Sequence, residues 1–145
     1  MCAYQNTGGF NTLLMMNQDN FLIPIRAAAI LTNSYVAGTV IGLNGEIPSL
    51  HNQVVLLCDF TIGSLTSASL KIETSPDNSA WYQEVFEEVT GGTATGTAGV
   101  HTLPAATGKY RYAIQVKDKY IRVSAIGTGT VTSSSLTIDA ILGTA

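Results

Sequence analysis

The side chains that could carry out chemistry are few and scattered along the sequence. Two histidines, His51 and His101, could act as bases toward a serine. Nucleophilic catalysis, however, needs the nucleophile held within hydrogen-bond reach of its base, and no spacing here arranges such a pair. The stretch Gly127-Thr-Gly-Thr lacks the third glycine and the lysine of phosphate-binding loops, so we interpret it as a turn between strands. The sequence therefore predicts no catalytic residues and no enzymatic activity.

Carboxylates are the other candidates, because paired acids can hydrolyse glycosides and clustered oxygens can bind calcium. Asp77 and Asn78 come nearest to a calcium-binding pair, but they lack the dense acidic spacing of calcium loops. We interpret them as a turn, and we interpret the glutamates as the solvated edge of a strand. We therefore expect no bound metal and no cofactor. The glutamates considered are Glu73, Glu84, Glu87 and Glu88.

Two cysteines, Cys2 and Cys58, make neither a disulfide framework nor a zinc site. Cys58 lies within an apolar run and is expected to be a small buried residue. Aromatic residues could form a platform for sugars or a contact between subunits, but packing in the core is the favoured interpretation. The aromatic residues in question are Trp81, Tyr82, Tyr110, Tyr112 and Tyr120.

The elements that would position these side chains are predicted to be strands. Apolar and polar residues alternate over 69–73 and again over 121–125, which is the period of a strand with one wet face. Between them, Ser75-Pro-Asp-Asn78 has turn chemistry, because Pro76 presets φ and Asn78 tolerates left-handed geometry. Turn signals recur at roughly 8–12 residue spacing, as in all-β sandwiches. We therefore predict an antiparallel β-sandwich, of jelly-roll or immunoglobulin-like type.

The predicted strands make up one domain over residues 21–145, as expected for a chain of 145 residues. The strand over 54–60 is expected to be central and buried on both faces, and Pro24 places the first strand at a sheet edge. Two hairpins are predicted, 68–74 with 81–89 and 110–116 with 120–126. Residues 91–99 are expected to form a loop. The remaining strands are 21–27, 35–43 (closed by a turn at Asn44-Gly45) and 131–142, the last with Leu136, Ile138 and Ala140 on one face.

Residues 1–20 precede this domain and are rich in Asn, Gln, Gly and Thr. They form either a disordered tail or an extended arm that orders against a neighbouring subunit, and the sequence leaves both open. In the second case the apolar island would bind the partner. Its residues are Leu13, Leu14, Met15 and Met16.

The bulk composition excludes some functions. Charged residues make up 12% of the chain, against about 25% in a typical soluble domain, and such a surface is easily covered by another protein. The net charge of −3 argues against binding to nucleic acid. We also expect no membrane span, because polar residues and Pro24 interrupt the apolar stretch over 21–43, and no signal peptide is visible.

Two resemblances rest on these motifs. Ser75-Pro-Asp-Asn78, Trp81 and Lys119-Tyr-Ile-Arg-Val resemble discoidin-like, galactose-binding β-sandwiches, although Asn78 replaces the glycine of that motif. Residues 52–73 and 127–140 (beginning Asn52-Gln-Val-Val and Gly127-Thr-Gly-Thr) are similar to small structural proteins of tailed bacteriophages. The second resemblance reaches further along the chain, over about residues 30–143.

The second resemblance implies a structural virion protein, expected to be a decoration or cement protein on the capsid exterior. Such a protein would be made in the host cytoplasm, bind the major capsid protein, bridge neighbouring capsomers and associate with itself as a homotrimer. A neck or tail location stays open. The alternative function is that of a carbohydrate-binding β-sandwich module.

Overall fold

A computed structural model describes residues 22–43, 53–83, 85–90, 93–116 and 118–143 of the chain. All regular elements among these residues are strands, which confirms the predicted all-β class. Several predictions fall outside them: the arm over 1–20 with its island Leu13–Met16, the turn at Asn44-Gly45, and His51. In the described part of the chain, no helix is long and apolar enough to cross a membrane.

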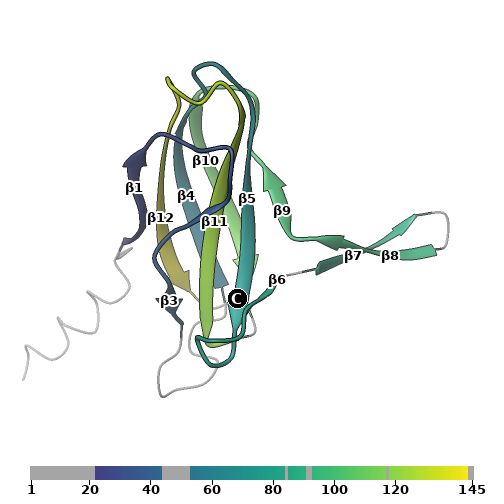
Figure 1. Ribbon diagram of the computed structural model, residues 1–145. Helices are drawn as coiled ribbons and strands as arrows, with labels where there is room; N and C mark the ends of the chain where they lie inside the picture. The colour runs from purple at the N-terminus through teal and green to yellow at the C-terminus, as the bar shows by residue number, and fades with distance from the viewer. Residues whose placement is uncertain (1–21, 44–52, 84, 91–92, 117, 144–145) are drawn as a thin grey trace, which may run out of the picture.

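The strands form two packed antiparallel sheets and a separate two-stranded ribbon (Figure 1). The first sheet has the order β1-β12-β4-β10. The second has β11 and β5 at its centre, with β2 and β3 beside β11 and with β6 and β9 beside β5. The bounds are β1 Ile23–Ala29, β2 Val36–Ala37, β3 Ile41–Gly42, β4 Gln53–Thr61, β5 Leu65–Ser75, β6 Tyr82–Gln83, β7 Val85–Thr90, β8 Thr93–Ala98, β9 Val100–Thr102, β10 Gly108–Gln115, β11 Tyr120–Gly129 and β12 Ser135–Gly143.

This strand order is that of a jelly roll. The pairs are nested from the chain ends inward: β1 with β12, β2 and β3 with β11, β4 with β10, and β5 with β6 and β9. Most connections therefore cross from one sheet to the other, as in a long hairpin rolled into two layers. In the immunoglobulin order, by contrast, successive strands such as A and B share a sheet. Of the two predicted types of sandwich, the jelly roll is the observed one.

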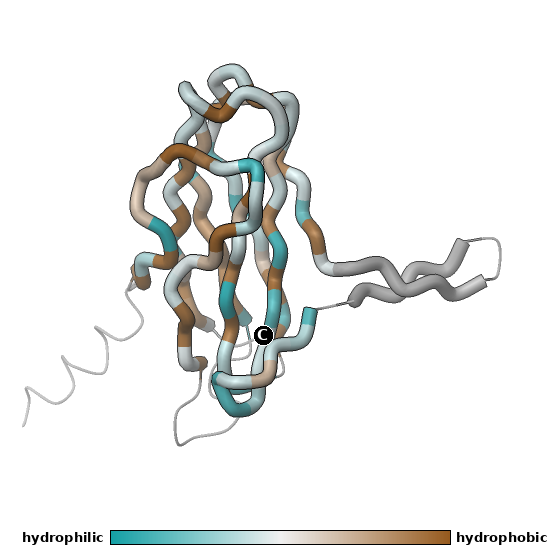
Figure 2. The backbone as a smooth tube through the Cα atoms, viewed as in Figure 1, coloured by the Kyte–Doolittle hydropathy of each residue, from teal (hydrophilic) through white to brown (hydrophobic). Residues whose placement is uncertain are grey.

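The core lies between the sheets and follows the period of two (Figure 2). Alternate residues of the four long strands point inward and are almost fully buried, so that apolar side chains from both layers meet. The predicted inner faces of the two C-terminal strands are confirmed. The core residues of these strands are Val54, Leu56, Cys58, Phe60, Leu65, Ala68, Leu70, Ile72, Ile121, Val123, Ala125, Leu136, Ile138 and Ala140.

Two predicted strands differ in detail. Strand β4 is central, between β12 and β10, but only one of its faces is buried; Leu57 on the other face is half-buried and Asp59 is exposed. The strand predicted over 35–43 is divided into β2 and β3 near Gly38. The Gly38 amide donates to Val123 and the Thr39 amide to Ile25, so that this short corner bridges the two sheets. Because of this bend, residues 35–43 do not pair with β11 as one continuous strand.

The second predicted hairpin is wrong. Strand β10 pairs with β4, and β11 pairs with β5, so the two strands lie in different sheets. Local sequence did not distinguish a tight turn from the crossing connection that the jelly roll requires at this point. As a consequence, Lys109 and Arg111 lie on one sheet and Arg122 on the other, although they are close in sequence.

The first predicted hairpin is correct only at its base. Strand β5 pairs with the short β6 (Glu73 opposite Gln83) and then with β9 (Lys71 opposite Val100). The Ile72 amide, which lies between these pairs, donates to the carbonyl of Gly99. Strands β6 and β9 are thus two halves of one edge strand, and β7 and β8 are inserted between them.

The inserted ribbon β7–β8 replaces both the predicted continuation of a strand to residue 89 and the predicted loop over 91–99. Its six ladder pairs run from Val85 opposite Ala98 to Thr90 opposite Thr93. The ribbon extends away from the two packed sheets (Figure 1). The Thr-rich composition of 93–98 is compatible with a strand because threonine is β-branched, a signal that the glycines around it obscured.

Candidate functional site

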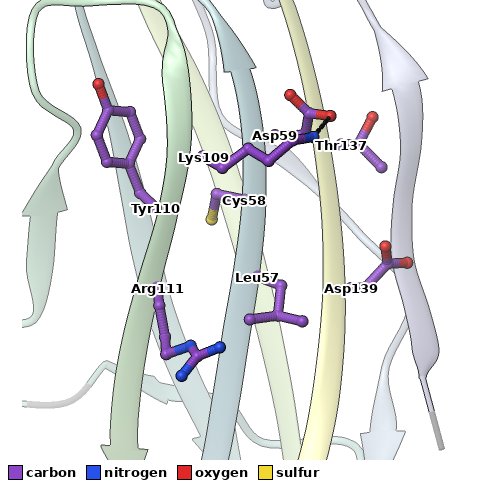
Figure 3. Close-up of a pocket in the computed structure, with 8 residues that line it drawn as sticks. All are labelled: Leu57, Cys58, Asp59, Lys109, Tyr110, Arg111, Thr137 and Asp139. Carbon is purple, nitrogen blue, oxygen red and sulfur yellow. Dashed lines mark hydrogen bonds and ion pairs between the residues drawn. The ribbon is translucent and has the colours of Figure 1, made fainter.

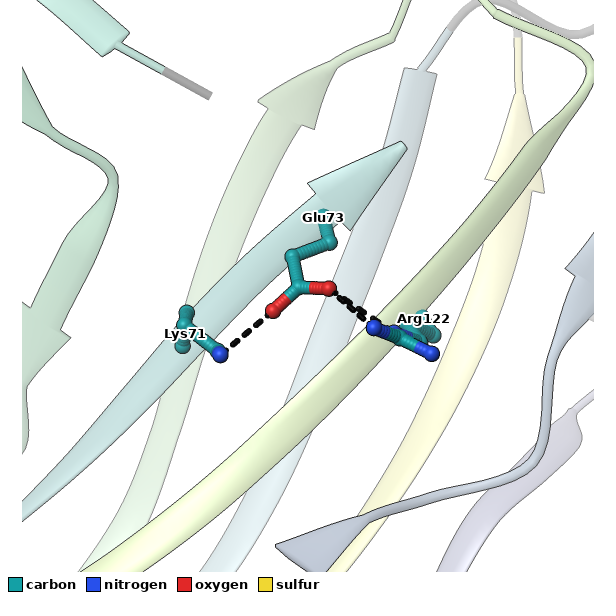
Figure 4. A network of polar contacts seen from close by, with 3 residues as sticks. All are labelled: Lys71, Glu73 and Arg122. Carbon is teal, nitrogen blue, oxygen red and sulfur yellow. Dashed lines mark hydrogen bonds and ion pairs between the residues drawn. The ribbon is translucent and has the colours of Figure 1, made fainter. Parts of the chain in front are cut away.

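The outer face of the second sheet, which has β5 and β11 at its centre, carries a compact charged network centred on Glu73 (Figure 4). Its carboxylate accepts a hydrogen bond from Arg122 Nε at 2.9 Å and is also paired with Arg122 Nη2. Lys71 Nζ lies 2.5 Å from the other carboxylate oxygen. The sheet register produces this arrangement, because Arg122 is the direct cross-strand partner of Glu73 and Lys71 lies two residues away on the same face.

Glu73 is the buried member of this network. Its side chain is 8% exposed, against 26% for Lys71 and 30% for Arg122. Burial by itself raises the pKa of Glu73, but hydrogen bonds from Lys71 and Arg122 and their coulombic attraction outweigh burial. The pKa of Glu73 is consequently below its ordinary value, and the carboxylate stays ionised. The sequence interpretation of Glu73 as a solvated strand edge was therefore wrong.

Two aromatic rings flank the network. The Arg122 guanidinium lies 4.4 Å from the centre of the Trp81 ring, and Lys71 Nζ lies 5.0 Å from the centre of the Tyr35 ring. These are cation–π distances. Trp81 is half-buried and lies outside the core cluster, so the expectation of a core tryptophan was wrong. The side chain of Tyr82, next in sequence, is 60% exposed.

The tyrosines of β10 follow the core interpretation instead. Tyr110 and Tyr112 are partly buried and pack against the core, and the Tyr110 hydroxyl donates to the Ala106 carbonyl at 2.8 Å. The ring of His101 on β9 lies 5.6 Å from that of Tyr112, centre to centre. His101 is thus half-buried between the edges of the two sheets.

The turn over residues 75–78 is built as its residue types predict. Asp77 Oδ1 accepts hydrogen bonds from the amides of Ser79 and Ala80, both at 2.9 Å, and from Ser75 Oγ. Asn78 has the left-handed φ of 60°. The backbone hydrogen bonds from Ala80 and Ser79 lower the pKa of Asp77. One carboxylate oxygen of Asp77 is therefore already occupied by the hydrogen bonds of the turn itself.

Among the residues that the structure describes, no group of three or more His, Cys, Asp or Glu side chains could hold a metal ion. Glu87 and Glu88 occur in β7, which belongs to a different sheet from the strand β5 that carries Glu73, and Glu84 is outside the described residues. Burial raises the pKa of the Cys58 thiol to about 12, so this cysteine is a core residue and not a nucleophile at neutral pH.

The outer face of the other sheet has a shallow depression of about 550 Å³ over β10, β4 and β12 (Figure 3). Lys109 Nζ lies 2.5 Å from Asp59 Oδ2, and both side chains are largely exposed. Arg111 and Asp139 lie on either side of Leu57, in one row of the register. The depression is thus a mixed surface of charged side chains around a partly buried leucine.

No protein-family model matches this sequence, and no match is found among curated proteins. The candidate sites therefore rest on the geometry described above. The candidate binding surfaces are the two outer sheet faces, one of which carries the aromatic and charged cluster, and the projecting ribbon.

Proposed function

We propose that this chain is a structural virion protein of a tailed bacteriophage, and that it decorates the outer capsid, where it binds the major capsid protein and bridges neighbouring capsomers. The observation that carries the proposal is the ribbon β7–β8, which leaves the jelly roll and extends from it (Figure 1). A lone two-stranded ribbon is marginally stable in water, so an extended ribbon is best explained by a partner surface.

The fold and the composition support the same proposal. Jelly rolls recur in viral capsid proteins, although the fold alone does not determine function. Charged residues make up only 12% of the chain, so that covering its surface costs little desolvation of charge. A cement protein acts in many copies, and modest contacts repeated around a shell sum to a large stabilisation.

Co-sedimentation with capsids tests the proposal. The purified chain is mixed with expanded capsids assembled from the major capsid protein of the same phage, and bound copies are counted after centrifugation. We expect saturation at a fixed ratio to capsomers, and capsids that resist heat or osmotic shock better than bare ones. The absence of saturable binding would refute the decoration role, and binding to necks or tails in its place would move the protein there within the virion.

The N-terminal arm has a separate test. If residues 1–20 anchor the protein through the island Leu13–Met16, their removal should abolish capsid occupancy while the melting temperature of the sandwich stays unchanged. Exposed apolar segments can add contact or strand pairing to a partner. Unchanged capsid occupancy after truncation would refute the anchoring role and leave the other interpretation, in which residues 1–20 are a disordered tail.

A carbohydrate-binding module is the second candidate, and exposed aromatic rings favour it. Tyr35 is 39% exposed, and Tyr35 and the half-buried Trp81 flank the charged network, which could hydrogen-bond to hydroxyl groups. The chain has a single tryptophan, Trp81. Sugar binding on this face should therefore change its fluorescence, and a glycan array with no positive sugar and no fluorescence change would eliminate this candidate.

A further inference from the structure

The strand β10 leaves a long sheet edge open. In the described part of the chain β10 pairs only with β4, through eight consecutive register pairs from Gly108 to Gln115. An edge of this length presents a row of unpaired amide and carbonyl groups that another strand can use. The opposite edge of the same sheet is different, because β1 has register irregularities and accepts a hydrogen bond from Thr39 at Ile25.

The edge is basic. Lys109 and Arg111 occur on β10, and residues 108–116 contain no acidic residue. Lys109 is paired with Asp59 of the neighbouring β4, so the free positive charge of this edge is that of Arg111. Arg111 is exposed, and in the part of the chain that the structure describes its guanidinium has no hydrogen-bond or ion-pair partner. Charged side chains on an edge strand hinder pairing with most strands, and an acidic strand is the kind whose charge would complement Arg111.

The ribbon β7–β8 supplies such a strand. Glu87 and Glu88 occur in β7, and no lysine or arginine occurs between residues 72 and 108. Strand β7 has six residues and β10 has eight, so β7 is long enough to pair along most of β10. The ribbon also arises on the side of the sandwich where β10 lies, because the ring of His101 on β9 lies 5.6 Å from that of Tyr112 on β10.

We propose that the ribbon β7–β8 of one copy docks on the open β10 edge of a second copy and extends its sheet. The ribbon extends away from its own sandwich (Figure 1), which favours a contact between copies over one within a copy. The contact joins two different surfaces, so it is heterologous and generates a closed ring where the rotation allows. This proposal depends on the proposed function in one respect: a closed ring of three copies would match the expected homotrimer.

The insertion point of the ribbon allows a clean deletion. Gln83 and Val100 pair with β5 on either side of Ile72, whose amide bonds Gly99. Removing residues 84–98 and joining Gln83 to Gly99 therefore makes the edge strand continuous. We expect this deletion variant to keep the melting temperature of the full chain, which shows that the sandwich is folded.

Size-exclusion chromatography with light scattering measures the association. We expect the full chain to form oligomers and the deletion variant to be a monomer. Arg111→Glu and the double reversal Glu87→Lys/Glu88→Lys should each raise the dissociation constant at least tenfold, and their combination in one chain should restore most of the affinity. Lys119→Glu, a charge reversal at an exposed residue in the bend before β11, is the matched control and should leave the mass unchanged.

Three results would overturn the proposal: a full chain that is monomeric at every concentration, a deletion variant that still forms the oligomer, or a Lys119→Glu effect equal to that of Arg111→Glu. Capsid co-sedimentation of the same variants separates this proposal from the decoration role. If the deletion variant keeps the oligomer while the full chain binds capsids, only the ribbon proposal fails. If the deletion yields monomers while the full chain ignores capsids, only the decoration role fails.

Discussion

Replacing Glu73 by glutamine should destabilise the protein by about 2 kcal/mol. Breaking a fully buried ion pair costs about 3–5 kcal/mol, and an exposed pair contributes about 0–1 kcal/mol. Glu73 is 8% exposed, but its cations Lys71 and Arg122 keep 26% and 30% exposure, so the expected cost lies between these limits. The amide of Glu73→Gln retains the shape but directs N–H groups toward two cations that lose their counter-charge.

The assay is urea unfolding at pH 7, with thermal unfolding beside it. A loss of 2 kcal/mol corresponds to a fall in melting temperature of roughly 6–8 °C for a domain of this size. Asp59→Asn is the matched control, because it makes the same change in the exposed Asp59–Lys109 pair on the other sheet. This control should cost less than about 1 kcal/mol. Equal losses for both variants would refute the argument that burial sets the cost.

The difference in unfolding free energy between the natural chain and Glu73→Gln is predicted to depend on pH. The folded pKa of Glu73 is lowered, so its contribution is fully present above the unfolded value of about 4.3 and is lost as pH falls through the folded pKa. The stability difference between the natural chain and Glu73→Gln should therefore be constant from pH 6 to 8 and shrink below about pH 4. A difference that grows on acidification would contradict the assigned direction of the pKa shift.

Further predictions concern the backbone and the thiol. Gly38→Ala should cost about 1–3 kcal/mol, because the added carbon would lie within 2.7 Å of a backbone oxygen; Gly42→Ala, whose nearest atom is 3.6 Å away, is the control and should be close to neutral in urea unfolding. Asn78→Gly should match or exceed natural stability, and Asn78→Ala should lose about 1 kcal/mol, because φ is 60° there. In a Cys2→Ser background, Cys58 should resist a thiol reagent at pH 8 until urea unfolds the chain; rapid labelling of the folded protein would contradict its burial.

Local pattern was sufficient for the strands whose one face is buried. The alternation over 121–125 and 136–140 identified inner and outer residues correctly, because the period of two is a property of the strand itself. It was insufficient for pairing. Strands β10 and β11 are adjacent in sequence yet lie in different sheets, and that choice depends on which layer buries which face, a non-local balance that a single turn does not reveal.

The candidate site was harder to predict than the fold. Glu73 and Arg122 are far apart in sequence, and only the register of β5 with β11 makes them direct partners. Trp81 follows a turn and precedes β6, so its position over Arg122 depends on where that turn ends. The signal that could have found the network is the match of Lys71, Glu73 and Arg122 in strand parity, once β5 and β11 are assumed to pair.

The ribbon is inserted at an edge of the second sheet, and this position allows it to contact a partner without disturbing the core. The ribbon is inserted between β6 and β9, which are the two halves of one edge strand. Neither half contains a residue of the buried core cluster. An insertion into β5 or β11 would interrupt ten or more ladder positions and the core residues between them. An insertion at the edge costs one ladder position opposite Ile72, whose amide is satisfied by Gly99. The stability of the jelly roll and the contact made by the ribbon are therefore separable, so that mutations in residues 84–98 should change association without changing the unfolding free energy of the sandwich.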